Sequence, residues 1–326
     1  MRVLVTGVAG FIGSNVADAL IARGDRVRGV DSFLDYYPRA VKERNLAGLN
    51  ASPAFEFHEQ DLVSADVNAL TDGCDAVLHL AAQAGVRASW GKDFRIYCDA
   101  NILATQRLLE ACTARKIRVV YSSSSSIYGD APDFPTRETT LPRPISPYGV
   151  SKLAGEHLCR LYSQSYGLPT ISLRYFTVYG PRQRPDMAIA KFVAAVSRGT
   201  PITLFGDGSS RRDYTFIDGI LDTIAPHDGG RTIDGITSGS KVSEAIAFYG
   251  QPLGPAEQDT GKDWLTFLAD ETRGFGYRMA IDGYNSTGTN ATGTINSTST
   301  STLSPGITIS TPGFNFKLPV TSVVRK

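Results

Sequence analysis

The first two thirds of the chain alternate short apolar runs with longer amphipathic ones. Runs rich in Val, Ile and Leu predict β-strands, which we expect at residues 2–6, 26–30, 76–80, 119–122, 170–173 and 202–204. The longer runs predict helices, for example at residues 11–22, 101–115, 148–166 and 189–198. This alternation is typical of an α/β fold of the Rossmann type, a doubly wound parallel sheet that binds ligands at the carboxyl ends of its strands.

The pattern changes in the last third of the chain. Residues 283–313 contain no charged side chain, and 15 of these 31 positions are Ser or Thr. Such low-complexity composition favours a flexible or edge-strand segment over a packed helix.

Composition narrows the functional classes. The chain has 326 residues, 42% hydrophobic and 20% charged, with a formal net charge of +1. Because no global field results, we expect neither a nucleic-acid nor a membrane partner, and no apolar run is long enough to cross a bilayer. The four cysteines form no CxxC pair and no metal-ligand spacing, and the N-terminus predicts a strand rather than a signal peptide. A cytoplasmic protein without a metal site is the expectation.

A glycine-rich turn follows the first predicted strand. Gly7, Gly10 and Gly13 have the spacing GxxGxxG, and Phe11 and Ile12 open the first predicted helix. Such glycines allow a tight turn, close approach of the backbone to a pyrophosphate, and packing of the helix on the strand. The N-terminus of the helix then offers N–H groups to the phosphates. The pattern predicts a dinucleotide site.

The second predicted strand is followed by Asp31. A carboxylate at this position accepts hydrogen bonds from both hydroxyls of the adenosine ribose and repels a 2′-phosphate. We therefore predict NAD as the cofactor, although Arg28 keeps NADP open as an alternative.

A second set of polar residues points to catalysis. Tyr148 and Lys152 are separated by one helical turn, and residues 122–126 form a run of serines at the end of a predicted strand. A free tyrosine has a pKa of about 10, and a nearby ammonium favours its phenolate. The combination predicts a Ser/Tyr/Lys site for proton transfer.

Together these motifs resemble the extended short-chain dehydrogenase/reductase family. Further segments are similar to its nucleotide-sugar epimerases, at residues 78–87, 174–186 and 206–214, and the resemblance covers residues 1–222. The segments that look most like UDP-glucuronate 4-epimerases are 31–37, 82–89 and 177–187.

The resemblance implies an isomerase that inverts C4 of a UDP-hexose, most closely UDP-glucuronate. Tyr148 would take the proton of the 4-hydroxyl while the C4 hydride moves to NAD, Lys152 would lower the tyrosine pKa and hold the nicotinamide ribose, and Ser124 would bind O4. Related dehydratases and decarboxylases carry an acidic residue in the stretch that corresponds to residues 125–128, where this chain has none. Epimerisation is therefore favoured over elimination.

The resemblance also implies contacts for both ligands. Asp61 and Leu62 would contact adenine, and the further cofactor positions are Leu80, Ala81 and Ala82. The positions expected at the UDP-sugar are Arg87, Ser125, Ser126, Thr177, Arg184 and Arg212. Relatives pair through the helices predicted at 101–115 and 148–166, so a homodimer is expected.

The expected organisation has three parts. Residues 1–174 form the NAD-binding Rossmann domain, residues 175–222 the family-like part of a smaller substrate lobe, and residues 223–326 depart from the family. Two alternatives stay open at this point: another UDP-sugar 4-epimerase, of the UDP-glucose type, and an NAD-binding protein that lost turnover with its substrate lobe.

Overall fold

The structure is a computed structural model, and it describes two compact units of the chain. Its described residues are 1–131, 136–204, 214–224 and four strands between residues 280 and 325. The first unit contains Met1–Phe176 and residues 221–224, and the second contains Thr177–Ile220 and the four later strands.

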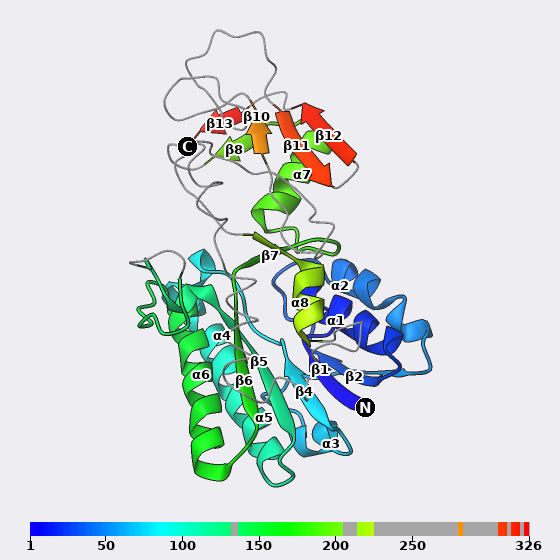
Figure 1. The fold of residues 1–326 in the computed structure, drawn as a ribbon, viewed down its shortest axis with the longest axis vertical. Coiled ribbons are helices and arrows are strands. Elements are labelled where there is room, and N and C mark those ends of the chain that lie inside the picture. The colour runs from blue at the N-terminus through cyan, green and yellow to red at the C-terminus, as the bar shows by residue number, and fades with distance from the viewer. Residues whose placement is uncertain are drawn as a thin grey trace. The chain divides into compact units, whose positions relative to one another are not determined.

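The first unit is built on a parallel sheet of six strands (Figure 1). The strands are β1 (Arg2–Thr6), β2 (Arg26–Asp31), β3 (Phe55–Glu59), β4 (Ala76–His79), β5 (Arg118–Ser124) and β6 (Thr170–Tyr175). Their order in the sheet is β3-β2-β1-β4-β5-β6. Strands β2 and β3 are therefore added on one side of β1, and strands β4, β5 and β6 on the other side. In a doubly wound sheet this switch point opens the crevice in which ligands bind.

The helices of the first unit form two groups. Helices α1 (Phe11–Ala22) and α2 (Arg39–Leu46) pack on each other, while α5 (Ala104–Thr113) packs on α3 (Val67–Thr71) and on α6 (Pro147–Tyr166). Because right-handed crossovers that travel in opposite directions place their helices on opposite faces, the sheet is covered on both sides. The predicted α/β fold of the Rossmann type is confirmed.

A π-helical turn interrupts the helix predicted at residues 101–115. Helix α4 (Phe94–Tyr97) continues into the π-helical turn η4 (Cys98–Leu103), and α5 follows without a break. A π-turn inserts an extra residue per turn and is common at functional sites. Here it contains Asn101, whose side chain is 1% exposed.

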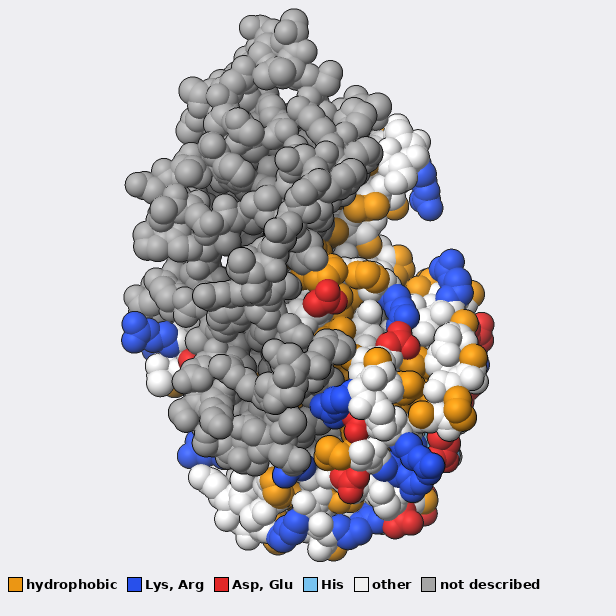
Figure 2. Space-filling view, turned by 45° about the vertical axis from the view of Figure 1, so that its right-hand side comes forward, with side chains coloured by type: hydrophobic (Ala, Val, Ile, Leu, Met, Phe, Trp, Pro, Cys, Tyr) orange, Lys and Arg blue, Asp and Glu red, His pale blue; other side chains and the backbone are white. Residues whose placement is uncertain are grey.

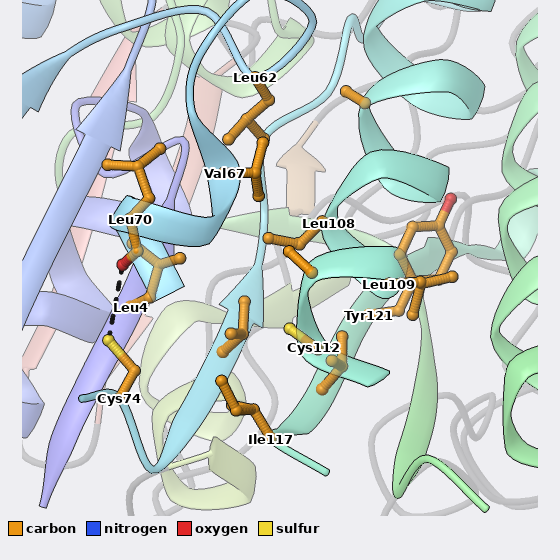
Figure 3. Packing of buried hydrophobic residues seen from close by; sticks show 14 of the residues in the cluster. Leu4, Leu62, Val67, Leu70, Cys74, Leu108, Leu109, Cys112, Ile117 and Tyr121 are labelled. Atoms are coloured by element: carbon orange, nitrogen blue, oxygen red, sulfur yellow. Dashed lines mark hydrogen bonds between the residues drawn. The ribbon is translucent and has the colours of Figure 1, made fainter. Parts of the chain in front are cut away.

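The apolar core of this unit fills the space between the sheet and helices α3 and α5 (Figure 3). Leu4 and Tyr121 contribute from the sheet, and Leu70 and Leu108 from the helices. Cys74 lies at the edge of this cluster, where its thiol contacts the carbonyl oxygen of Leu70 at 3.7 Å. The core therefore holds the sheet rigidly under the loops at its carboxyl edge.

The described residues of the second unit form three small sheets. Strand β7 (Thr177–Tyr179) pairs with β9 (Tyr214–Phe216), β8 (Ile202–Leu204) pairs with β13 (Val323–Arg325), and β10 (Ala280–Asp282), β11 (Gly306–Thr311) and β12 (Phe314–Pro319) form an antiparallel sheet. Helix α7 (Ala188–Arg198) belongs to this unit, and α8 (Ile217–Ile224) spans the division between the units. The strand predicted at 202–204 thus exists but lies outside the large sheet. Of the Ser/Thr-rich stretch, only β11 falls within the described residues.

Charged side chains of both signs are interspersed over the described surface seen in Figure 2. This mixture agrees with the net charge of +1. Among the described helices, none combines the length and the apolar character that a bilayer crossing requires.

Candidate active site

The glycine turn lies at the carboxyl end of β1. Gly7 has a φ of +69° and donates its N–H to the carbonyl of Val30 at 2.8 Å. A Cβ on Gly13 would lie 2.2 Å from the Gly7 carbonyl oxygen, so this contact of helix with loop requires glycine. Helix α1 begins after Gly10 with neither a side-chain cap nor an acidic residue in its first turn. Its N–H groups are therefore available to an anion, which fits the pyrophosphate of a dinucleotide.

Asp31 ends β2 beside this turn and is held on both carboxylate oxygens. Oδ2 accepts the N–H of Ala9 at 3.1 Å, and Oδ1 accepts the N–H of Phe33 at 2.8 Å. The ammonium of Lys42 lies 3.5 Å from Oδ1 and also donates to the carbonyl of Leu34 at 3.2 Å. Asp31 and Lys42 are 8% and 6% exposed, so this is a buried charge pair at the position expected for the adenosine ribose.

Arg28 is engaged away from Asp31. Its guanidinium donates from Nη1 to the carbonyls of Ala69, Leu70 and Asp72 at 2.9–3.1 Å, and from Nε to Glu56 at 3.3 Å. These bonds complete the last turn of α3, where carbonyl oxygens lack helical partners. Arg28, which left NADP open as an alternative cofactor, is therefore engaged in hydrogen bonds to the end of α3.

The remaining predicted cofactor positions lie in loops that follow the strands. Leu80 and Ala81 come directly after β4, and both donate their N–H groups to Oγ1 of Thr6, at 3.1 and 3.0 Å. Ala82 follows them. Asp61 and Leu62 come after β3, where Oδ1 of Asp61 accepts the N–H of Val63 at 2.9 Å. These loops share the carboxyl edge of the sheet with the glycine turn and Asp31.

The serine run turns from β5 into the short 3-10 helix η5 (Ser125–Ile127). Oγ of Ser124 accepts the N–H of Ser126 at 3.1 Å, which leaves its own O–H available as a donor. Two buried hydroxyls at this edge, Ser123 Oγ and Tyr175 OH, have no hydrogen-bond partner among the described residues. Such groups are rare in a folded interior, and both lie where β5 and β6 end.

Tyr148 and Lys152 lie in the first turns of α6. Ser146 caps this helix by accepting the N–H of Gly149 at 3.1 Å, and a proline fills the first helical position. The ring of Tyr148 packs edge-on against Tyr97, with 6.2 Å between ring centroids. The Tyr97 hydroxyl is in turn fixed by the carbonyls of residues 84 and 85, at 2.9 and 2.8 Å.

Lys152 is buried beneath the serine run. Its side chain is 3% exposed, and Nζ donates to the carbonyl of Ser122 at 2.8 Å. Burial lowers the pKa of Lys152 to about 8, because the ammonium loses its hydration there. The site thus holds a cation that is hydrogen-bonded to one carbonyl and is one helical turn from Tyr148.

A partly buried ion pair joins β6 to α6. Arg174, on β6, donates to both carboxylate oxygens of Glu156 at 2.8–3.2 Å. The same guanidinium donates to the hydroxyl of Tyr128 at 2.8 Å and to the carbonyl of Glu138 at 2.9 Å. Through this guanidinium, Tyr128 and Glu138 are both connected to helix α6.

The predicted substrate residues are divided between the two units. Ser125 and Ser126 lie in η5 next to Ser124, and Arg87 is exposed in the 3-10 helix η2 (Arg87–Ser89). Thr177 and Arg184 belong to the second unit, in which Arg184 makes a two-bond ion pair with Asp186 at 2.9 and 3.0 Å. Arg212 lies outside the described residues.

Lys42 is a candidate that the motifs alone did not indicate. Helix α2 is mostly polar, but its buried residues Lys42, Asn45 and Leu46 have the spacing i, i+3, i+4. This spacing marks a buried face in the sequence, and a lysine on such a face needs an anionic partner. By contrast, His79 at the end of β4 is 1% exposed and has a hydrogen-bond partner at each ring nitrogen.

The glycine turn, Asp31, the serine run, Tyr148 and Lys152 define an NAD-dependent enzyme of the epimerase type. The chain matches the NAD dependent epimerase/dehydratase family over residues 3–225 and belongs to that family. The resemblance to extended short-chain dehydrogenases/reductases that act on nucleotide sugars is confirmed, and with it NAD as the cofactor.

Individual relatives are similar over the same region. An uncharacterized UDP-glucose epimerase of Bacillus subtilis, YtcB, is 44% identical over 241 residues, which cover 72% of this chain and 76% of the relative. The UDP-glucuronate 4-epimerase of Thermodesulfobacterium geofontis is 42% identical over 222 residues, covering 67% and 68%. The crystal structure of UDP-glucuronic acid 4-epimerase from Bacillus cereus, in complex with UDP-glucuronic acid and NAD, superposes with a TM-score of 0.67 at 45% identity, covering 68% and 71%.

Proposed function

We propose that this protein epimerises a UDP-hexose at C4 with bound NAD, most specifically UDP-glucuronate to UDP-galacturonate. The observation that carries the proposal is the buried ammonium of Lys152, one helical turn from Tyr148 and under the strand end that presents Ser124. A cation held in this way favours a phenolate on the same helical face. A tyrosine base is what oxidation of a secondary alcohol requires.

Bound NAD supplies a reversible hydride acceptor for C4. Tyr148 takes the proton of the 4-hydroxyl and later returns it, while the Ser124 hydroxyl donates a hydrogen bond to O4. Lys152 keeps a positive charge beside the developing phenolate. The 4-keto sugar turns over in the pocket before it takes the hydride back on its other face, so C4 is inverted. Because the proton and the hydride both return to the sugar, the reaction is balanced without another oxidant or reductant.

Residues 125–128 favour epimerisation over elimination. The stretch Ser125-Ser126-Ile127-Tyr128 carries hydroxyls and no carboxylate, and the Tyr128 hydroxyl already accepts a hydrogen bond from Arg174. Loss of a 6-hydroxyl would require a general acid at this place. The hydroxyls instead suit a sugar carboxylate, for which Ser125, Ser126 and Thr177 are the proposed partners.

We propose that arginines bind the UDP moiety. Arg87, Arg184 and Arg212 are the proposed phosphate ligands, because a guanidinium matches phosphate geometry. In the proposed organisation, residues 1–174 form the NAD-binding domain, residues 175–222 are the family-like part of the substrate lobe, and residues 223–326 depart from the family.

UDP-glucose is the second candidate substrate. It is favoured by the 44% identity to the B. subtilis relative whose name specifies a UDP-glucose epimerase. A protein that binds NAD without turnover is the remaining alternative.

The test is incubation of the purified protein with UDP-glucuronate, without added NAD, followed by NMR. We expect UDP-galacturonate to form, and Tyr148→Phe to abolish it while bound NAD is retained. UDP-glucose and UDP-N-acetylglucosamine are offered in parallel to identify the sugar. If none of the three is converted while NAD stays bound, the enzyme proposal fails.

We also propose that the protein is a homodimer and that it lies in the cytoplasm. Leu103 in η4 and Leu161 in α6 are 42% and 53% exposed, and apolar side chains on these helices suit a helical dimer face. The four free cysteines agree with a reducing compartment. Sedimentation of Leu161→Glu against the unmodified protein tests the dimer: the variant is expected to sediment as a monomer.

A further inference from the structure

A chain of buried hydrogen bonds runs from the cofactor loops through His79. Thr6 Oγ1, at the end of β1, accepts the N–H groups of Leu80 and Ala81 and lies 2.8 Å from Nδ1 of His79. On the other side of the ring, Nε2 lies 2.9 Å from Oγ1 of Thr105. Thr6, His79 and Thr105 are each at most 1% exposed.

The partners at both ends require the same form of the imidazole. The Thr6 hydroxyl uses both lone pairs for two N–H groups, so its own proton must be donated to Nδ1 of His79. The Thr105 hydroxyl donates its proton to the carbonyl of Asn101 at 2.7 Å, so it can only accept from Nε2. The ring must therefore be neutral, with its proton on Nε2, and all bonds of the chain point in one direction.

The surroundings of the ring support the neutral form. The titratable groups that face it are Tyr121, with 5.8 Å between ring centroids, and the ammonium of Lys152. Burial, with a smaller contribution from that ammonium, lowers the pKa of His79 to about 3. A second cation beside Lys152 is thus avoided.

From Asn101 the chain continues to the catalytic helix. The Asn101 amide exchanges two bonds with the backbone of Gln83, at 2.7 and 3.0 Å, and donates to Oγ of Ser151 at 2.9 Å. Ser151 Oγ donates in turn to the carbonyl of Tyr148 at 2.7 Å. One continuous chain thus joins the loop after β4 to the backbone of the proposed base.

We propose that His79 is a positioning residue of the epimerase. As the neutral Nε2–H tautomer it links the end of β1, from which the glycine turn starts, to the π-turn that anchors α6. It thereby fixes the Tyr148 backbone relative to the cofactor loops. This inference rests on the proposed function, in which Tyr148 is the base.

The tautomer is tested on the NAD-loaded protein by ¹H–¹⁵N correlation of its four histidine rings. The His79 signals are identified by their loss in His79→Gln. We expect Nδ1 at the shift of an unprotonated ring nitrogen and Nε2 at that of a protonated one. A protonated Nδ1 would overturn the proposal. This measurement does not depend on activity.

The positioning role is tested by breaking the chain at Thr105, which is not itself at the site. Thr105→Val removes both hydrogen bonds at nearly constant shape, and Thr105→Ser keeps the hydroxyl. Thr113→Val is the matched control, because Thr113 makes the same bond to the carbonyl four residues earlier, to Leu109 at 2.8 Å, but is outside the chain.

We expect Thr105→Val to lose on the order of ten- to a hundred-fold in kcat, with KM and bound NAD little changed. The Leu80 and Ala81 amides should exchange with solvent faster than in Thr113→Val. Thr105→Ser should recover most of kcat. Unchanged kcat in Thr105→Val, or loss of bound NAD to the same extent as kcat, would refute positioning. If the unmodified protein converts no UDP-sugar, the proposed function fails, while the tautomer and amide exchange still decide whether the chain exists.

Discussion

Replacing Lys152 by methionine is expected to stabilise the fold while removing the proposed activity. The pKa falls from 10.5 to about 8 on burial, a difference of about 2.5. At 1.36 kcal/mol for each pKa unit, the buried ammonium costs about 3 kcal/mol at neutral pH. Methionine fills similar volume without charge but leaves the Ser122 carbonyl without this donor, which costs about 1 kcal/mol. The expected net gain is about 2 kcal/mol.

The sign of the pH dependence follows from the lowered pKa of Lys152. Below pH 8 both the folded and the unfolded chain carry the proton, and the full cost is present. Between pH 8 and 10.5 the unfolded chain binds more protons than the folded one, so the free energy of unfolding of the unmodified protein rises with pH. Lys152→Met lacks this rise, and its advantage should therefore shrink as the pH increases.

Urea denaturation of the NAD-free proteins measures this difference, since bound NAD would stabilise only the folded state. Lys92→Met, at an exposed lysine, is the control and should match the unmodified protein at both neutral and alkaline pH. A Lys152→Met protein that is less stable at neutral pH would contradict the burial argument. So would an advantage that persists unchanged at high pH.

Three further outcomes follow from the geometry. Gly13→Ala places a Cβ 2.2 Å from the Gly7 carbonyl and should cost about 1–3 kcal/mol and release NAD, seen as loss of nucleotide absorbance from the purified protein. Glu156→Leu leaves the Arg174 guanidinium without its carboxylate and should lower the free energy of unfolding by about 3 kcal/mol, measured by urea denaturation. The double variant with Arg174→Met should recover most of that loss. No recovery would contradict the pairing. Burial lowers the pKa of His79 from 6.5 to about 3, so the free energy of unfolding should fall as the pH drops from 6.5 to 3. His79→Gln should flatten that fall. An equal slope in the two proteins would count against a buried neutral ring.

The apolar runs predicted the large sheet well, except at its edge. Strands β1, β2, β4, β5 and β6 were expected because strands buried on both faces are nearly continuous in Val, Ile and Leu. The edge strand Phe55–Glu59 alternates aromatic and polar residues and escaped notice, as did the polar helix α2. Strand β8 was predicted from its composition, but its partner Val323–Arg325 lies far along the chain. Composition carries no information about such pairing.

The candidate site likewise contains some residues that the sequence indicated and others that it did not. Gly7, Asp31, Ser124, Tyr148 and Lys152 belong to motifs with short spacings, so the sequence alone indicated them. Contacts that depend on the fold were not indicated. The bond between Thr6 and His79 spans 73 positions and requires two strands to be neighbours. Lys42 beside Asp31 likewise depends on how α2 packs, and only the buried spacing of that helix hinted at it.

The π-turn η4 makes the length of its helix as important as its composition. The turn holds one residue more than an α-helix would, so deleting a residue within Cys98–Leu103 would let it relax into regular α-helix while Tyr97 and Thr105 keep their relative phase. A deletion within α5 has no extra residue to absorb it and would rotate the helix by about 100° at that point. In a library of variants, single-residue deletions should therefore be tolerated within Cys98–Leu103 at positions other than the hydrogen-bonded Asn101, and rejected within α5.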